Sequence, residues 1–115
     1  MSTAVKTSVI ARAQRGIAGT RGPGPIDRFL DAVWMERGLS PNTLAAYRAD
    51  LTALDRWLEG HEAELTSANR GDLLAFMASR VQAGAQPRST ARQLSSFRRF
   101  YRYLLREGAL REDPT

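Results

Sequence analysis

The residues whose type and spacing point to chemistry are arginines. Six arginines fall between residues 88 and 106, with no acidic residue among them. In an α-helix, with about 100° per residue, five of the six share an arc of roughly 80°. These five are Arg88, Arg92, Arg99, Arg102 and Arg106. Guanidinium groups stay protonated and form paired hydrogen bonds with phosphate or with guanine, so this row predicts contact with a polyanion.

The opposite side of the same segment is apolar at spacings of three and four residues, which predicts a buried stripe. Its members are Leu94, Phe97, Tyr101, Leu104 and Leu105. The short polar residues Ser89, Thr90 and Ser95 lie along the segment as well. We therefore expect the arginines to point outward, so that replacing Arg92 or Arg99 leaves the fold intact.

The charge distribution also favours a polyanion site. The chain carries 17 basic and 12 acidic residues, for a net charge of +5. The first 25 residues hold four of the basic residues and no acid, whereas the remainder has 13 arginines against 12 acids. A basic row on a nearly neutral body matches DNA best, because a helix fits the major groove. An acidic surface on a partner protein and a merely solvated face remain as alternatives.

Other kinds of chemistry find little support. The absence of cysteine excludes disulfides, thiolate zinc sites and cysteine catalysis. The single histidine, His61, lies in a polar link without a partner at ligand spacing, so we expect it to be solvent-exposed. The motif GxxxxGK[ST] is missing, and no apolar run reaches the roughly 18 residues of a membrane span. We predict no catalytic residue, no metal and no cofactor in this chain, which is therefore not an enzyme by itself.

Four amphipathic helices must position the arginine row. The first is expected over 25–37, where proline opens the helix and Gly38 follows it. The second begins at Ser40 and Pro41 and closes at Gly60. The third follows Asn69, which forms a capping box with Asp72, and runs towards residue 84. The fourth extends from residue 87 to a stop at residue 108.

Each of the first three helices has its own expected apolar stripe. The stripes consist of Ile26, Phe29, Leu30, Val33 and Trp34 in the first, Leu44, Tyr47, Leu51, Leu54 and Leu58 in the second, and Leu73, Leu74, Met77 and Val81 in the third. No segment shows the alternation of a strand, so the fold class is all-α, a four-helix bundle around one core.

We divide the chain into three parts. Residues 1–24 are predicted to form a flexible basic tail, because they are rich in small residues and lack aromatic ones. A transit peptide and a leader upstream of the true domain are the alternative interpretations of this tail. Residues 25–110 are expected to form a four-helix, DNA-binding domain. Residues 111–115 are polar, include a proline, and are expected to begin a linker to a further domain.

Two blocks of the sequence resemble a known family. FLDAVWMERGLSPNTLAAYRADL and RQLSSFRRFYRYLLREG, at their separation in this chain, resemble the N-terminal core-binding domain of Xer-type tyrosine recombinases. The resemblance covers residues 26–114. Two segments are closer to the XerD branch than to the XerC branch, namely FLDAVWMERGL and the final REDP. It implies an orthogonal four-helix bundle of the SAM-like type. The equivalent domain of a phage or plasmid integrase is the alternative within the family.

The resemblance also implies a function and the residues that carry it. The second and fourth helices would grip double-stranded DNA at a recombination half-site, and a separate domain would supply the nucleophilic tyrosine of a phosphotyrosyl intermediate. The residues that match the DNA-facing positions, or lie in the arginine row beside them, are Asn42, Thr43, Tyr47, Arg48, Arg88, Ser89, Thr90, Arg92, Ser95, Arg98, Arg99 and Arg102. Tyr47 also falls on the core stripe, so its role stays open between the two.

The remaining expectations concern the whole parent protein. Its partners would be XerC-like recombinase subunits in a tetrameric synapse, its role the resolution of chromosome dimers at cell division, and its location the bacterial cytoplasm at the nucleoid. The isolated domain is expected to be monomeric, and the first helix, near Trp34, to contact neighbouring subunits on DNA.

Overall fold

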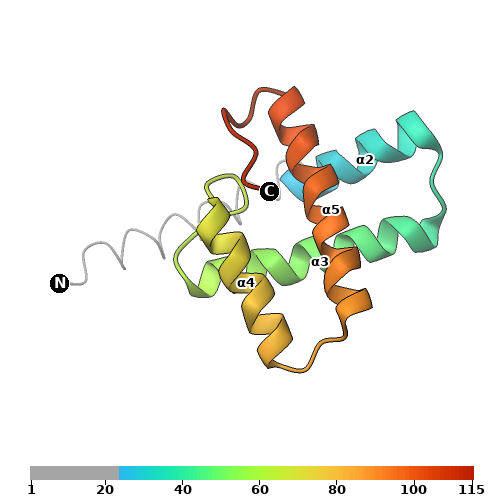
Figure 1. The fold of residues 1–115 in the computed structure, drawn as a ribbon. Coiled ribbons are helices and arrows are strands. Elements are labelled where there is room, and N and C mark those ends of the chain that lie inside the picture. Colours follow the sequence, from blue (N-terminus) through green and yellow to red (C-terminus); the bar gives the residue numbers. More distant parts are fainter. Residues whose placement is uncertain (1–23) are drawn as a thin grey trace.

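The computed structural model describes residues 24–115, and these contain four α-helices and no strand. The helices are α2 (Pro25–Arg37), α3 (Pro41–Gly60), α4 (Arg70–Gln82) and α5 (Pro87–Arg106). The two long helices, α3 and α5, cross steeply, and α2 and α4 complete the bundle around them (Figure 1). The predicted all-α, four-helix architecture is confirmed.

Local sequence signals set the helix boundaries. Ser40 caps α3, where its Oγ accepts a hydrogen bond from the backbone N–H of Thr43 at 3.2 Å. Asn69 and Asp72 form the predicted capping box of α4, with reciprocal side chain to backbone bonds of 2.8 and 3.0 Å. Gly38 follows α2 in the left-handed region at φ 59°, which a residue without Cβ adopts at little cost.

All four helices contribute to one core. The middle of α3 supplies Leu51, Leu54 and Leu58, each of them fully buried. The other helices and the α3–α4 link surround this row with Phe29, Leu30, Val33, Leu65, Leu73, Phe76, Phe97, Phe100, Tyr101 and Leu104. Leu44, Tyr47 and Met77 pack at its edge. The core therefore contains most of the predicted stripes.

Five residues that were predicted to lie in the core are not buried there. Trp34, Leu74, Val81 and Leu105 are exposed, and Leu94 is only partly covered. Phe76 and Phe100, which the stripes omitted, are buried instead. In α5 the reason is angular. The buried residues from Gln93 to Leu104 span an arc of about 140°, and Leu94 and Leu105 lie roughly 20–40° beyond its edge.

His61, in the link between α3 and α4, is exposed as predicted. It stacks on Trp57, with ring centroids 3.8 Å apart, and its Nδ1 donates to the Trp57 carbonyl.

The two ends of the domain bear on the remaining expectations. In the C-terminal segment Pro114 is buried and Leu110 packs against the core, and whether residues 111–115 begin a linker stays a prediction. The predicted tail, apart from Gly24, lies outside the described residues. Within residues 24–115, no helix is both long and apolar enough to span a membrane.

Tyr101 joins α5 to the α3–α4 link. Its ring is fully buried, and its hydroxyl donates to the carbonyl oxygen of Leu65 at 2.7 Å. Burial raises the pKa of Tyr101 well above its ordinary value, and the nearby carboxylates of Asp55, Asp72 and Asp113 raise it further. The phenol therefore stays protonated in the folded domain under conditions where a free tyrosine would ionise.

We expect Tyr101→Phe to lower the free energy of unfolding by about 1–2 kcal/mol at pH 7, because the Leu65 carbonyl loses its donor. The raised pKa adds a pH dependence. Above about pH 10 the unfolded chain releases the Tyr101 proton and the folded chain keeps it, so stability falls as pH rises. Urea unfolding at pH 7 and pH 10.5 measures both effects. An equally steep alkaline loss in the phenylalanine variant would exclude Tyr101 as its source.

Candidate nucleic-acid interface

The α5 arginines differ in how they are held. Arg88, Arg98 and Arg102 are exposed, and no acidic side chain within residues 24–115 forms a salt bridge with them. Arg92, Arg99 and Arg106 each bind a side chain from another helix. The net positive charge of the row is thus smaller than the sequence of α5 alone indicated, because acidic side chains from α2 and α3 compensate part of it.

Arg92 forms the most buried of these contacts. Its Nη2 lies 2.7 Å from Oδ1 of Asp50 and its Nε lies 3.3 Å from Oδ2, so the pairing is bidentate. Asp50, in α3, is 1% exposed and also accepts a 2.7 Å hydrogen bond from the hydroxyl of Ser96. Arg92 is therefore exposed, as expected, but it does not simply project into solvent. Its side chain is 57% exposed, yet it neutralises a buried carboxylate.

Arg99 lies two turns further along α5 and binds Tyr47. Its Nη1 donates to the Tyr47 hydroxyl at 2.6 Å, and its guanidinium carbon lies 5.8 Å from the centre of the tyrosine ring. Tyr47 itself packs at the core edge and against Phe29. Its ring thus takes the predicted place at the core edge and its hydroxyl meets the arginine row, while its DNA-facing role stays a prediction. Because that oxygen accepts from Arg99, its own proton remains available to an incoming acceptor.

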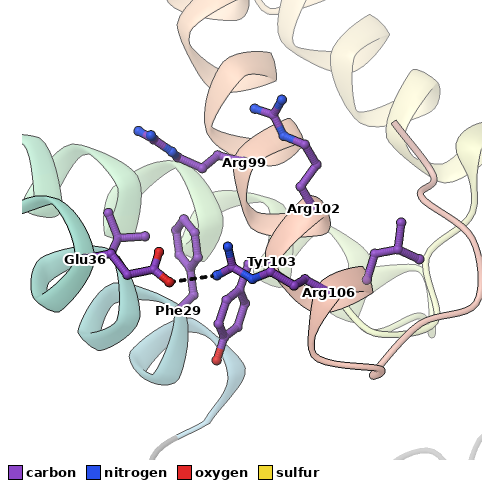
Figure 2. Close-up of a pocket in the computed structure, with 8 residues that line it drawn as sticks. Phe29, Glu36, Arg99, Arg102, Tyr103 and Arg106 are labelled. Carbon is purple, nitrogen blue, oxygen red and sulfur yellow. Dashed lines mark hydrogen bonds and ion pairs between the residues drawn. The ribbon is translucent and has the colours of Figure 1, made fainter.

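Arg106 closes the row at the α2 side. Its Nη2 lies 3.1 Å from Oε1 of Glu36, and both side chains are about half exposed. Both residues line a hollow of about 540 Å³. Figure 2 shows their contact, with Arg99 and Arg102 projecting from the preceding turns of α5. Phe29, Tyr103 and other apolar side chains form part of the lining of the hollow. An exposed pair of this kind contributes about 0–1 kcal/mol, so Arg106 is free to exchange Glu36 for a stronger anion.

The predicted residues at the start of α3 do not all approach the row. Asn42 is exposed, and Thr43 is engaged in the helix cap, with its Oγ1 3.0 Å from Oγ of Ser40. Arg48 faces α2, where its Nη2 lies 2.8 Å from Oδ1 of Asp27. Of the four α3 positions taken from the resemblance, Tyr47 is the one that forms a hydrogen bond with an α5 arginine.

The short polar residues of α5 have separate surroundings. Ser95 is exposed on the same side as Arg88 and Arg102, at the helical spacing of the row. Thr90 donates to the carbonyl of Pro87 at 3.0 Å, and Ser89 is half-buried beside it in the first turn. Of these residues, Ser95 is the one whose surroundings best match the predicted outward face.

Sequence reasoning missed three buried polar residues near the row, which are Asp50, Gln93 and Ser96. Gln93 is buried and accepts from Nε of Arg80 in α4 at 3.3 Å, and Ser96 and Asp50 are buried as a pair. The sequence did contain a signal that Asp50 is buried, because Asp50 follows Tyr47 by three residues and directly precedes Leu51 on the apolar stripe. An acid at the edge of such a stripe needs a buried partner. Every buried side-chain nitrogen or oxygen of the described chain has a hydrogen-bond partner.

The same region contains no arrangement typical of metal binding. Among residues 24–115 there is no cluster of three or more histidine or acidic side chains that could hold a metal ion. The arrangement offers instead a row of guanidinium groups, a tyrosine hydroxyl and a serine hydroxyl on one side of the bundle. Such donors bind phosphate oxygens and the edges of bases.

Comparison with known proteins agrees with this chemistry. The family model described as "Phage integrase, N-terminal SAM-like domain" matches residues 26–108. The chain is 51% identical over 90 residues to the tyrosine recombinase XerD of Pseudomonas aeruginosa. It is 49% identical to the XerD of Yersinia pestis and 43% identical to that of Haemophilus influenzae, over 90 residues in each case. These alignments cover 78% of this chain and 30% of each relative, so the chain spans under a third of their length.

The Arg92–Asp50 pair makes a prediction about stability. Arg92→Ala leaves the buried Asp50 carboxylate with Ser96 alone, so we expect the free energy of unfolding to fall by about 2–3 kcal/mol. Arg98→Ala is the matched control on the same helix, because Arg98 is exposed and removing it should change stability by less than about 0.5 kcal/mol. Urea unfolding followed by circular dichroism compares the two. Equal, small effects would show that Asp50 does not depend on Arg92.

Proposed function

Since the chain belongs to the family of phage-integrase N-terminal SAM-like domains, we propose that it is the DNA-binding domain of a XerD-like tyrosine recombinase and grips a recombination half-site through α5. The observation that carries this proposal is the arginine row, with exposed arginines between others anchored from α3. Such a surface supplies several cations, of which Arg92 and Arg99 are held in position from α3, and cations along one face are what binding to a DNA backbone requires.

The role of α3 in this proposal is to orient rather than to add charge. Tyr47 and Asp50 reach α5 from α3, whereas Arg48 is engaged by Asp27 on the α2 side. We therefore assign the main contacts to Arg88, Arg92, Ser95, Arg98, Arg99 and Arg102 of α5. Asn42, Thr43, Arg48, Ser89 and Thr90 remain contacts suggested by the family resemblance.

The parent protein would carry out the reaction that the relatives' name describes. We propose that a further domain supplies the catalytic residues, that cleavage proceeds through a phosphotyrosyl bond, and that XerC-like subunits complete the synapse. Resolution of chromosome dimers at the bacterial nucleoid is the corresponding role of the whole protein. The present chain would contribute binding and positioning to that reaction.

The alternative ligand of the same surface is an acidic partner protein. A dependence of binding on the base sequence of the duplex would distinguish DNA from such a protein. We expect the chain to bind a duplex with a Xer half-site about tenfold more tightly than a scrambled duplex of equal length at physiological salt, because wrong base pairs each cost about 1–3 kcal/mol. Fluorescence anisotropy with both duplexes measures the ratio. Equal affinity for both duplexes would argue against specific recognition.

The salt dependence tests the arginine row directly. Replacing both Arg88 and Arg102 with alanine should reduce the slope of log K against log salt by about 0.9 for each phosphate that the protein no longer neutralises, or about 1.8 in total. Arg70→Ala removes the same kind of charge from α4 and should leave the slope nearly unchanged. A slope unchanged in the double variant, with intact helicity, would remove α5 from the interface.

A further inference from the structure

We propose that the buried Asp50 is a positioning residue for DNA binding: it holds the Arg92 guanidinium so that one defined edge of the group faces the nucleic acid. The inference rests on the proposed function and assigns a role to a residue that does not itself reach the DNA. It gives a physical reason for an acidic residue beneath a surface that must attract a polyanion.

The geometry fixes which donors of Arg92 are used. A guanidinium carries five N–H groups in one plane. Asp50 takes the Nε–H and one of the two Nη2–H groups, at 3.3 and 2.7 Å. The two Nη1–H groups and the other Nη2–H remain, and the side chain is 57% exposed. The outer edge, formed by Nη1 and Nη2, is therefore available.

That outer edge has a specific complement. Its two parallel N–H groups match a pair of acceptors, either O6 and N7 of guanine or two oxygens of a phosphodiester. A mobile arginine loses up to about 2 kcal/mol of side-chain entropy when it binds. Arg92 has already lost much of this freedom in the folded domain, so less is lost on contact with DNA.

The carboxylate is itself held firmly. Asp50 and Ser96 are each 1% exposed, and the Ser96 hydroxyl donates to Oδ2 at 2.7 Å, so a second partner residue fixes the plane of the carboxylate. Arg92 and Ser96 are one turn apart on α5, and Asp50 comes from α3. The position of Arg92 is thus set by the crossing of the two helices.

A purely structural salt bridge gives a different expectation for DNA affinity. By charge alone, removing Asp50 adds one positive charge near a polyanion and should strengthen binding. If Asp50 positions Arg92, the same change should weaken binding although the net charge rises. The sign of the change in affinity therefore distinguishes the two roles.

The variant Asp50→Asn keeps the shape and removes the charge. In the whole chain we expect it to bind the half-site duplex about tenfold more weakly, with a smaller change on the scrambled duplex. Asp31→Asn, an exposed position on α2, is the charge-matched control and should bind as well as the unmodified chain or better. Combining Asp50→Asn with Arg92→Ala should weaken binding no further than Arg92→Ala alone. Unchanged or tighter binding by a folded Asp50→Asn chain overturns the inference.

If the Asp50→Asn chain does not fold, Arg92→Lys tests the inference in its place. Lysine keeps the positive charge beside Asp50 and lacks the second donor edge. We expect about tenfold weaker half-site binding with an unchanged salt slope. Affinity equal to that of the unmodified chain overturns the inference.

Modified duplexes identify the acceptor. A half-site with 7-deazaguanine lacks the N7 acceptor, and one with methylphosphonate linkages lacks charged phosphate oxygens. The modification that removes the difference between the unmodified chain and Arg92→Lys marks the group that Arg92 binds. If neither modification reduces the difference, Arg92 does not contact DNA and the inference fails.

The same experiments separate this inference from the proposed function. If the unmodified chain prefers the half-site and loses affinity when Arg88 and Arg102 are replaced, the proposed function stands whatever Asp50→Asn does. If the unmodified chain shows no preference for the half-site, both ideas fail together.

Discussion

The crossing of α3 and α5 combines an apolar contact with an ion pair whose carboxylate is buried, and the arrangement of the surface follows from it. Leu51 and Leu54 pack in the same core as Phe97 and Phe100, which brings the two helices together. At the edge of this contact Asp50 meets Arg92 and Ser96. Removing a carboxylate from water is unfavourable by several kcal/mol unless its oxygens are paired, so the two helices are constrained to the register that supplies both partners.

That register determines which cations reach solvent with their charge uncompensated. Asp50 and Glu36 compensate Arg92 and Arg106, and Asp27 compensates Arg48 on the α2 side. Arg88, Arg98 and Arg102 remain exposed. On α5 itself, the acids thus compensate some of the arginines and leave others uncompensated, and the same acids keep Arg92 and Arg106 in place.

The sequence predicted the helices well because their ends are determined locally. Ser40 with Pro41, Asn69 with Asp72, and Gly38 each act within one turn of the chain. The angular limits of the buried faces were predicted less well. Trp34 and Leu105 are apolar and were assigned to the core, but how far a helix is covered depends on its neighbours. The Arg92–Asp50 pair was missed because its partners are 42 residues apart and meet only through the helix crossing.

Replacing a buried ion pair with apolar residues often leaves a protein equally stable or more stable, so stability alone is a weak reason for Asp50. Two features of the same helix pair point to orientation instead. Tyr47 and Asp50 are three residues apart on α3, and each binds an arginine of α5. Both arginines keep donors that these contacts do not use. An apolar contact between α3 and α5 would hold the helices together equally well, but it would leave Arg92 and Arg99 free to rotate. The polar contacts thus convert the packing of two helices into fixed positions for the groups on their outer surface.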